Sequence, residues 1–172
     1  MKLNNIVRAA LFCALICVAT AFLQIPLPIT GYVHLGDAVI FLACVFLPFP
    51  YSAAAAAVGS ALADVLGGWA SYAPVTLVVK FVMACVFCAV MRGKKWQFVV
   101  GAILASLWMA VGYGAYEFVL YGAEALANMP FNVLQGTAGM LIAFVVAFAM
   151  QRFWKEQRGN LASQRKYAHN KK

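Results

Sequence analysis

Charged side chains are scarce in this chain of 172 residues. Asp, Glu, Lys and Arg together make up 10% of it, whereas an ordinary soluble domain carries about 25%. Hydrophobic residues account for 65%, and the mean hydropathy is +0.86. Between Ala9 and Met91 the only formally charged residues are Asp37, Asp64 and Lys80. This composition excludes an ordinary soluble domain and is typical of a chain that lies in a membrane.

Motifs for catalysis and cofactor binding are missing as well. The sequence holds no G-x-x-x-x-G-K-[ST] motif, so we expect no ATP hydrolysis by this chain itself. Its five cysteines lie in apolar runs, and Cys85 and Cys88 form a C-x-x-C pair with no second pair or histidine nearby. We therefore expect no disulfide framework, no metal site, no cofactor and no enzymatic activity.

Prolines and glycines divide the apolar sequence into six segments. We expect helices over about residues 6–23, 37–47, 51–66, 74–91, 98–122 and 130–152. The second segment would rise only ~16 Å as a helix, short of a hydrocarbon core of ~30 Å. The predicted fold class is an all-α integral membrane protein with six transmembrane helices. Residues 1–152 form one substrate-binding membrane domain, and residues 153–172 form a basic tail that we expect to be disordered.

The net charge of +8 comes from basic residues gathered in three places: the N-terminus, residues 92–95 and the tail after residue 151. Six spans with both termini in the cytoplasm place all three on the inner side, as the positive-inside rule requires. The connectors at 24–36, 67–73 and 123–129 then face outward. We expect a multi-pass protein of a prokaryotic cell membrane. No basic stripe interleaved with aromatics indicates a nucleic-acid partner.

Most of the unusual polar residues fall near the outward ends of the spans. A charge at membrane depth costs at least ~2.5–3.5 kcal/mol on the insertion scale, so such residues indicate a polar cavity. Acids, a lysine, amides and aromatics together suit a small polar, heteroaromatic molecule. The candidate substrate-binding residues are Asp37, Asp64, Lys80, Glu117, Asn132 and Gln135 for polar contacts and Trp69, Tyr72 and Tyr121 for stacking.

Structural roles remain open for several of these residues. Asp37 follows Gly36 and has the position of a helix N-cap. Asp64 and Lys80 have the character of a structural ion pair, since charges inside a membrane usually pair with one another. The aromatic side chains also suit an interface belt, and the two amides suit bridges between helices. His34 is as compatible with a loop residue as with a ligand contact.

Small residues form a second pattern in the first helix. Ala10 and Ala14, spaced by four, make a smooth stripe that allows another helix to approach closely. The alanine-rich segment 51–66 offers a similar surface, for which packing inside the bundle is the stronger interpretation. For the first helix, internal packing and contact with a partner are equally compatible with the spacing.

Four short segments resemble one known family. They are GYVHLGD at 31–37, SALAD at 60–64, YAPVT at 72–76 followed by Lys80, and NVLQ at 132–135. In order and within six short spans, they are similar to the substrate-binding membrane subunits, or S components, of energy-coupling factor (ECF) vitamin transporters. The resemblance covers about residues 5–152 and is greatest to the riboflavin-type branch, which includes carriers of hydroxymethylpyrimidine or pyridoxine.

The resemblance implies a subunit that captures a small water-soluble vitamin or precursor from outside. Hydroxymethylpyrimidine or pyridoxine is favoured, and riboflavin is possible. It also implies docking on a membrane coupling subunit that carries two cytoplasmic ATPases, with Ala10 and Ala14 at the contact and residues 25–36 as a lid. The alternative from the residues alone is a self-sufficient, ion-coupled secondary transporter that uses Asp64 and Lys80 as a relay. Such carriers often show internal repeats, and none is visible here.

Overall fold

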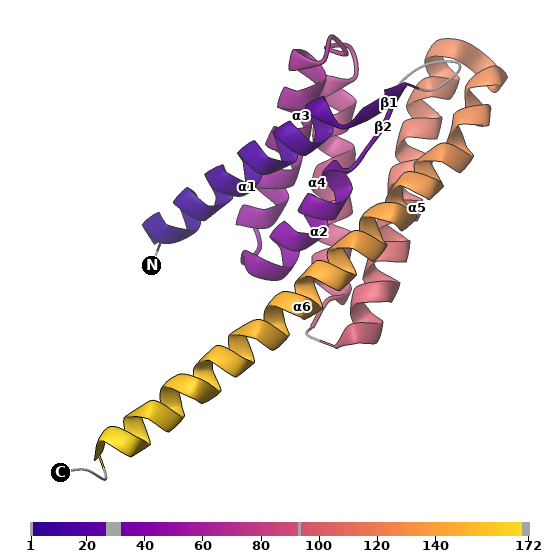
Figure 1. Cartoon of the computed structure of the whole chain (residues 1–172). Coiled ribbons are helices and arrows are strands. Elements are labelled where there is room, and N and C mark those ends of the chain that lie inside the picture. The colour runs from indigo at the N-terminus through magenta and orange to yellow at the C-terminus, as the bar shows by residue number, and fades with distance from the viewer. Residues whose placement is uncertain (1, 27–31, 93, 170–172) are drawn as a thin grey trace.

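The protein is a bundle of six α-helices in the computed structural model, which describes residues 2–26, 32–92 and 94–169 (Figure 1). The helices are α1 (Lys2–Phe22), α2 (Gly36–Phe46), α3 (Tyr51–Leu66), α4 (Ala73–Val90), α5 (Lys95–Tyr121) and α6 (Met129–His169). A hairpin of β1 (Gln24–Pro26) and β2 (Tyr32–His34) lies between α1 and α2, and a 3₁₀ helix, η1 (Gly122–Asn128), joins α5 to α6. All six predicted helices are present; the short hairpin was not predicted.

Apolar helices cover the outside of the bundle. The stretches Leu3–Phe22, Ala73–Val90 and Lys95–Met150 are long and apolar enough to cross a membrane, whereas α2 and α3 are apolar but shorter. Large side chains such as Leu11 (61% exposed) and Val111 (56%) point away from the core. A soluble bundle would bury such a surface, so the chain is an all-α membrane protein.

Helix α2 is short because protein surrounds it. It contacts α1, α3, α4 and α6, and Ile40, Phe41 and Ala43 are fully buried. A helix enclosed in this way does not have to match the thickness of the bilayer by itself. Its length of 11 residues is therefore compatible with a place in the middle of a membrane bundle.

Helices α1 and α3 pack closely through small residues. A Cβ added to Gly59 of α3 would lie 2.6 Å from the carbonyl oxygen of Cys13 in α1, so only glycine allows this approach. Ala10 and Ala14 of α1 are exposed instead. The small residues of α3 thus serve internal packing, while the alanine stripe of α1 faces outward.

The half of the bundle away from the hairpin is filled by aromatic side chains. Phe87 of α4 packs against Phe41 of α2 and Phe98 of α5, with ring centroids 5.0 and 5.2 Å apart. The hairpin and η1 lie at the opposite end from the start of α1 and the far end of α6 (Figure 1).

Helix α6 continues past Arg152 to His169, where the sequence analysis predicted a disordered tail from residue 153. The segment contains Lys, Glu, Gln, Arg, Leu and Ala, which are strong helix formers, so it extends the helix that precedes it. Residues 170–172 of the predicted tail and residues 27–31 of the predicted lid lie outside the described part of the chain.

Candidate functional site

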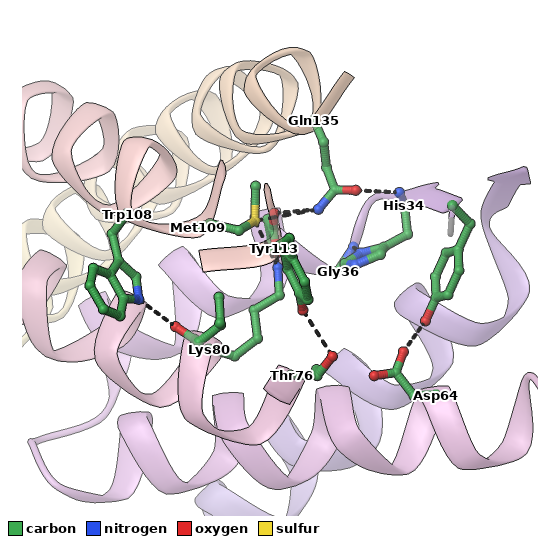
Figure 2. A network of polar contacts seen from close by, with 12 residues as sticks. His34, Gly36, Asp64, Thr76, Lys80, Trp108, Met109, Tyr113 and Gln135 are labelled. Atoms are coloured by element: carbon green, nitrogen blue, oxygen red, sulfur yellow. Dashed lines mark hydrogen bonds and ion pairs between the residues drawn. The ribbon is translucent and has the colours of Figure 1, made fainter. Parts of the chain in front are cut away.

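A polar pocket lies beneath the hairpin, between β2 and four helices. It encloses about 370 Å³ including the open space at its mouth. Its walls are built by Tyr32 and His34 of β2, Asp64 of α3, Tyr72 and Thr76 at the start of α4, Tyr113 and Glu117 of α5, and Asn132 and Gln135 of α6. Figure 2 shows how several of these side chains converge.

The hairpin forms the roof of this pocket. Side chains two positions apart on a strand point to the same face, and the rings of Tyr32 and His34 lie 5.5 Å apart. The Tyr32 hydroxyl donates to Asp64 Oδ1 at 2.5 Å. The His34 backbone N–H donates to Gln135 Oε1 at 2.9 Å. Two hydrogen bonds therefore hold β2, one to α3 and one to α6.

The His34 imidazole is neutral and has a defined tautomer. The Gly36 backbone N–H donates to His34 Nδ1 at 3.0 Å, so the imidazole proton is on Nε2. Burial lowers the pKa of His34 to about 4. Burial and the hydrogen bond to Asp64 raise the pKa of Tyr32, which keeps its phenol protonated. The roof of the pocket carries no charge of its own at neutral pH.

Helices α4 and α5 form an opposite wall whose polar groups are largely engaged. The Tyr113 hydroxyl donates to Thr76 Oγ1 at 3.0 Å. The Tyr72 hydroxyl donates to Glu117 Oε1 at 3.4 Å, and Asn128 Nδ2 donates to Glu117 Oε2 at 3.3 Å. These bonds orient two aromatic rings and a carboxylate toward the same space.

Two polar atoms in the pocket walls have no hydrogen-bond partner among the described residues. They are Asp64 Oδ2, an acceptor, and Asn132 Nδ2, a donor. Asp64 is only 4% exposed and Asn132 only 5%. A buried polar group without a partner costs about 1–3 kcal/mol, and nearly all such groups in native proteins are satisfied. The pocket walls thus present one unused acceptor and one unused donor.

A buried ion pair lies under the pocket. Lys80 Nζ contacts Asp37 Oδ1, and both side chains are fully buried. Gln135 Nε2 donates to Asp37 Oδ2 at 2.7 Å, and Lys80 Nζ also lies 3.0 Å from the Met109 sulfur. The predicted pairing of Asp64 with Lys80 is wrong: the aspartate of central helix α2 reaches Lys80 instead.

The N-cap role considered for Asp37 is also wrong. The N-cap position of α2 is Leu35, and no side chain caps the helix there. Both carboxylate oxygens of Asp37 bind the side chains of other helices instead. In the membrane interior a lysine and an amide satisfy the charge better than the backbone of a helix end does.

The pocket brings together five of the residues predicted from the sequence, namely Asp64, Tyr72, Glu117, Asn132 and Gln135. Asp37 and Lys80 are not in its lining but lie beneath it. Trp69 also lies outside the lining, where its ring packs against Tyr32 and Tyr72 at 5.7 and 5.9 Å. Tyr121 is 46% exposed at the last residue of α5, where the chain turns into η1.

Three lining residues, Tyr32, Thr76 and Tyr113, were not predicted, and His34 had been left open between a loop residue and a ligand contact. Tyr113 precedes Glu117 by one helical turn, and Thr76 precedes Lys80 by one turn. Helical periodicity therefore places both on the same face as a predicted site residue, and this pattern could have identified them. The alternation of Tyr32 and His34 indicates one face of a strand, but a three-residue strand has no clear pattern. Among the described residues, no group of three His, Cys, Asp or Glu side chains could hold a metal ion.

A polar pocket at one end of a bundle of apolar helices is compatible with a substrate-binding membrane subunit, and the similarity of this chain to known proteins points to the same class. The model of the family described as ECF-type riboflavin transporter, S component, matches residues 1–152. A protein of Pyrococcus woesei, described as "Uncharacterized protein in gap 3'region", is 30% identical over 141 residues, covering 80% of this chain and 95% of the relative. The chain belongs to this family of ECF transporter S components.

Proposed function

We propose that this chain captures a small water-soluble vitamin or vitamin precursor, hydroxymethylpyrimidine or pyridoxine, in the pocket beneath the hairpin. The observation that carries the proposal is the unpaired acceptor at Asp64 Oδ2 together with the unpaired donor at Asn132 Nδ2. A heteroaromatic ring that carries amino or hydroxyl groups as donors and a ring nitrogen or hydroxyl oxygen as an acceptor supplies both partners. Tyr72 and Tyr113 line the same space, so their rings are available for contact with the ring of the substrate.

The size of the pocket favours a single ring. The space between its walls is about 370 Å³, a figure that includes open space at the mouth, so a small ring needs less rearrangement of the walls than a larger molecule does. The family description names riboflavin, whose three fused rings and ribityl chain require more room. Riboflavin would fit only if the hairpin moved away from Asp64. We therefore place riboflavin second.

Isothermal titration of the purified chain tests the choice of substrate. We expect hydroxymethylpyrimidine or pyridoxine to bind and riboflavin to bind more weakly or not at all. Tight binding of riboflavin alone would overturn the single-ring assignment. Absence of binding to every pyrimidine, pyridine and flavin in the panel would overturn the proposed function itself.

Delivery of the substrate requires partners. We propose that six spans place both termini in the cytoplasm, that the pocket opens outward, and that α1 docks on a coupling subunit carrying two ATPases. The exposed Ala10 and Ala14 support this, because the close packing of α1 inside the bundle uses a different face, that of Cys13 and Ile16. Small residues on an exposed helix face let a second helix approach closely.

The ion-coupled carrier receives less support. Its relay needed Asp64 and Lys80 to exchange a proton, but Lys80 is paired with Asp37 and Asp64 with Tyr32. Liposomes that contain this chain alone separate the two functions: proton-dependent uptake would favour the carrier, and uptake only in the presence of coupling and ATPase subunits favours the S component.

A further inference from the structure

We propose that Gln135 is a positioning residue that fastens the hairpin to the buried ion pair and thereby keeps the pocket closed. This inference rests on the proposed function, since it assigns to Gln135 the retention of the substrate. The side chain extends from α6 and binds both the backbone of His34 in β2 and the carboxylate of Asp37, which follows three residues later at the start of α2.

The contacts of Gln135 form a continuous chain of hydrogen bonds. Its Oε1 accepts from the His34 N–H at 2.9 Å, and its Nε2 donates to Asp37 Oδ2 at 2.7 Å. Asp37 in turn binds Lys80. His34, Gln135, Asp37 and Lys80 are all buried. The chain therefore runs from the strand at the roof, through α6 and α2, to α4.

The amide of Gln135 satisfies both neighbours at once. The backbone N–H of His34 needs an acceptor, and the carboxylate of Asp37 needs a donor. Gln135 presents one of each. A carboxylate at this position would face the carboxylate of Asp37, and an apolar side chain would leave both neighbours buried without a partner, which is costly at this depth.

The same contact separates two different cavities. His34 and Gln135 line the polar pocket, and they also line an apolar groove of about 480 Å³ on the other side of the hairpin. The remaining walls of the groove are apolar and include Leu23, Ile25, Phe131 and Leu134, all of which are exposed toward the surroundings of the bundle. The His34–Gln135 bond thus closes the pocket on the side that faces lipid.

Loosening this bond has a functional consequence that differs from removing a substrate contact. Among the described residues, the side chains of Asp64 and Gln135 tie the hairpin to α3 and α6. The proposed substrate binds the same carboxylate as Tyr32, at its other oxygen, whereas the Gln135 bond involves neither of the unpaired atoms that the substrate uses, so it persists while the substrate binds. Without it, a bound molecule escapes faster, although the groups that contact it are unchanged.

Hydrogen exchange of the full-length protein without substrate, read by mass spectrometry on the peptide that contains His34, tests the anchor. In Q135E and Q135M we expect the amide hydrogen of His34 to exchange at least about tenfold faster than in the wild type. Both variants lose the side chain that accepts from this amide while donating to Asp37. The matched control is N132D, which adds a carboxylate one turn away on α6. It has no hydrogen bond to the hairpin or to Asp37, and we expect wild-type exchange.

A double variant that swaps the acid and the amide between positions 37 and 135 gives a sharper test. In the double variant Q135E/D37N, the introduced carboxylate accepts from both the His34 N–H and the introduced amide, and the cluster keeps its net charge. We expect the double variant to return most of the way to the wild-type exchange rate, a non-additive effect that requires direct contact. Exchange as fast as in Q135E, or equal acceleration in N132D, would overturn the proposal.

Substrate kinetics complete the test. With pyridoxine or hydroxymethylpyrimidine as the probe, Q135M should dissociate about tenfold faster or more than the wild type, with association changed less. Unchanged dissociation together with unchanged hydrogen exchange would overturn the anchor role. If the wild type binds neither probe, the proposed function fails, while the exchange experiment on the substrate-free protein still decides the anchor. Q135M introduces no charge, so it keeps the test valid if Q135E does not fold.

Discussion

Asp37 of α2 and Lys80 of α4 form an ion pair in which both side chains are fully buried. The pair joins the short central helix to its neighbour beneath the polar pocket, and Gln135 adds a bond from α6. Three helices are thus fixed at the same depth by one polar cluster.

Removing one partner of this pair should destabilise the fold strongly. We expect Lys80→Met to lower the free energy of unfolding by about 3–5 kcal/mol, because it leaves the carboxylate of Asp37 buried without its counter-charge. The double variant Lys80→Met/Asp37→Asn should recover most of this loss. Thermal unfolding of detergent-solubilised protein measures both, with the exposed Glu124→Gln as a control. Equal destabilisation by the single and double variants would contradict the interpretation.

Asp64 is expected to contribute directly to substrate affinity. A hydrogen bond to a charged group contributes about 1.5–3 kcal/mol, so Asp64→Asn should weaken binding of the substrate roughly 10- to 150-fold. Isothermal titration checks this, with Glu124→Gln as a variant that loses a carboxylate outside the pocket lining. Wild-type affinity in Asp64→Asn would show that this carboxylate serves only to hold Tyr32.

Tyr32 should slow the entry of substrate. Its hydroxyl binds Asp64 Oδ1 and so holds the hairpin over the pocket, and the hairpin has to lift from Asp64 to admit the substrate. Tyr32→Phe keeps the ring that lines the pocket but removes the bond, so we expect association to become about 5- to 100-fold faster. Stopped-flow measurement of substrate association gives the answer. An unchanged association rate would mean that this bond does not limit entry.

His34 makes the stability of the protein depend on pH. Its pKa lies near 4 in the folded protein because it is buried, against an ordinary value of 6.5. The unfolded chain therefore binds more protons between these values, and stability rises with pH across this window. We expect about 3 kcal/mol of stability that is fully present above about pH 6.5 and is lost as the pH falls toward 4. Unfolding measured from pH 4 to 8 should show this slope, and His34→Gln should remove it.

The alanine stripe of α1 should matter for uptake and not for binding. Ala10→Trp or Ala14→Trp places a bulky ring on an exposed face, so we expect vitamin uptake in cells with the coupling and ATPase subunits to fall at least about tenfold while affinity stays unchanged. Val111→Trp, on the exposed face of α5, is the matched control. Loss of affinity and uptake together would indicate that the stripe packs inside the bundle.

Much of the architecture could be predicted because its signals are local. Pro48 and Pro50 end the second apolar segment, Gly67 and Gly68 end the third, and these breaks agree with the bounds of α2 and α3. Asn132 and Gln135 were expected on one face of a helix, and both line the pocket. Helix ends and helix faces follow from chain chemistry and periodicity within a few residues of the position concerned.

The errors concern contacts between segments that are distant in the chain. The sequence offers two aspartates, Asp37 and Asp64, as partners for Lys80. It does not show which helix lies against α4 at the depth of Lys80. Tyr32 was missed, and the role of His34 was left open, because a three-residue strand forms only when its partner strand and Gln135 hold it. Tyr121, which was also assigned to the pocket, lies at the last residue of α5, outside the lining.

The sequence by itself determined that this chain is a helical membrane protein with its polar groups near one end, because a scarcity of charge and the positions of breakers depend on composition alone. The tertiary structure decided which polar groups meet. The rotation of each helix about its axis turned Asp37 toward Lys80, left Asp64 Oδ2 and Asn132 Nδ2 facing the pocket without partners, and turned Ala10 and Ala14 outward. Those rotations are set by packing over the whole bundle, so no single segment carries them.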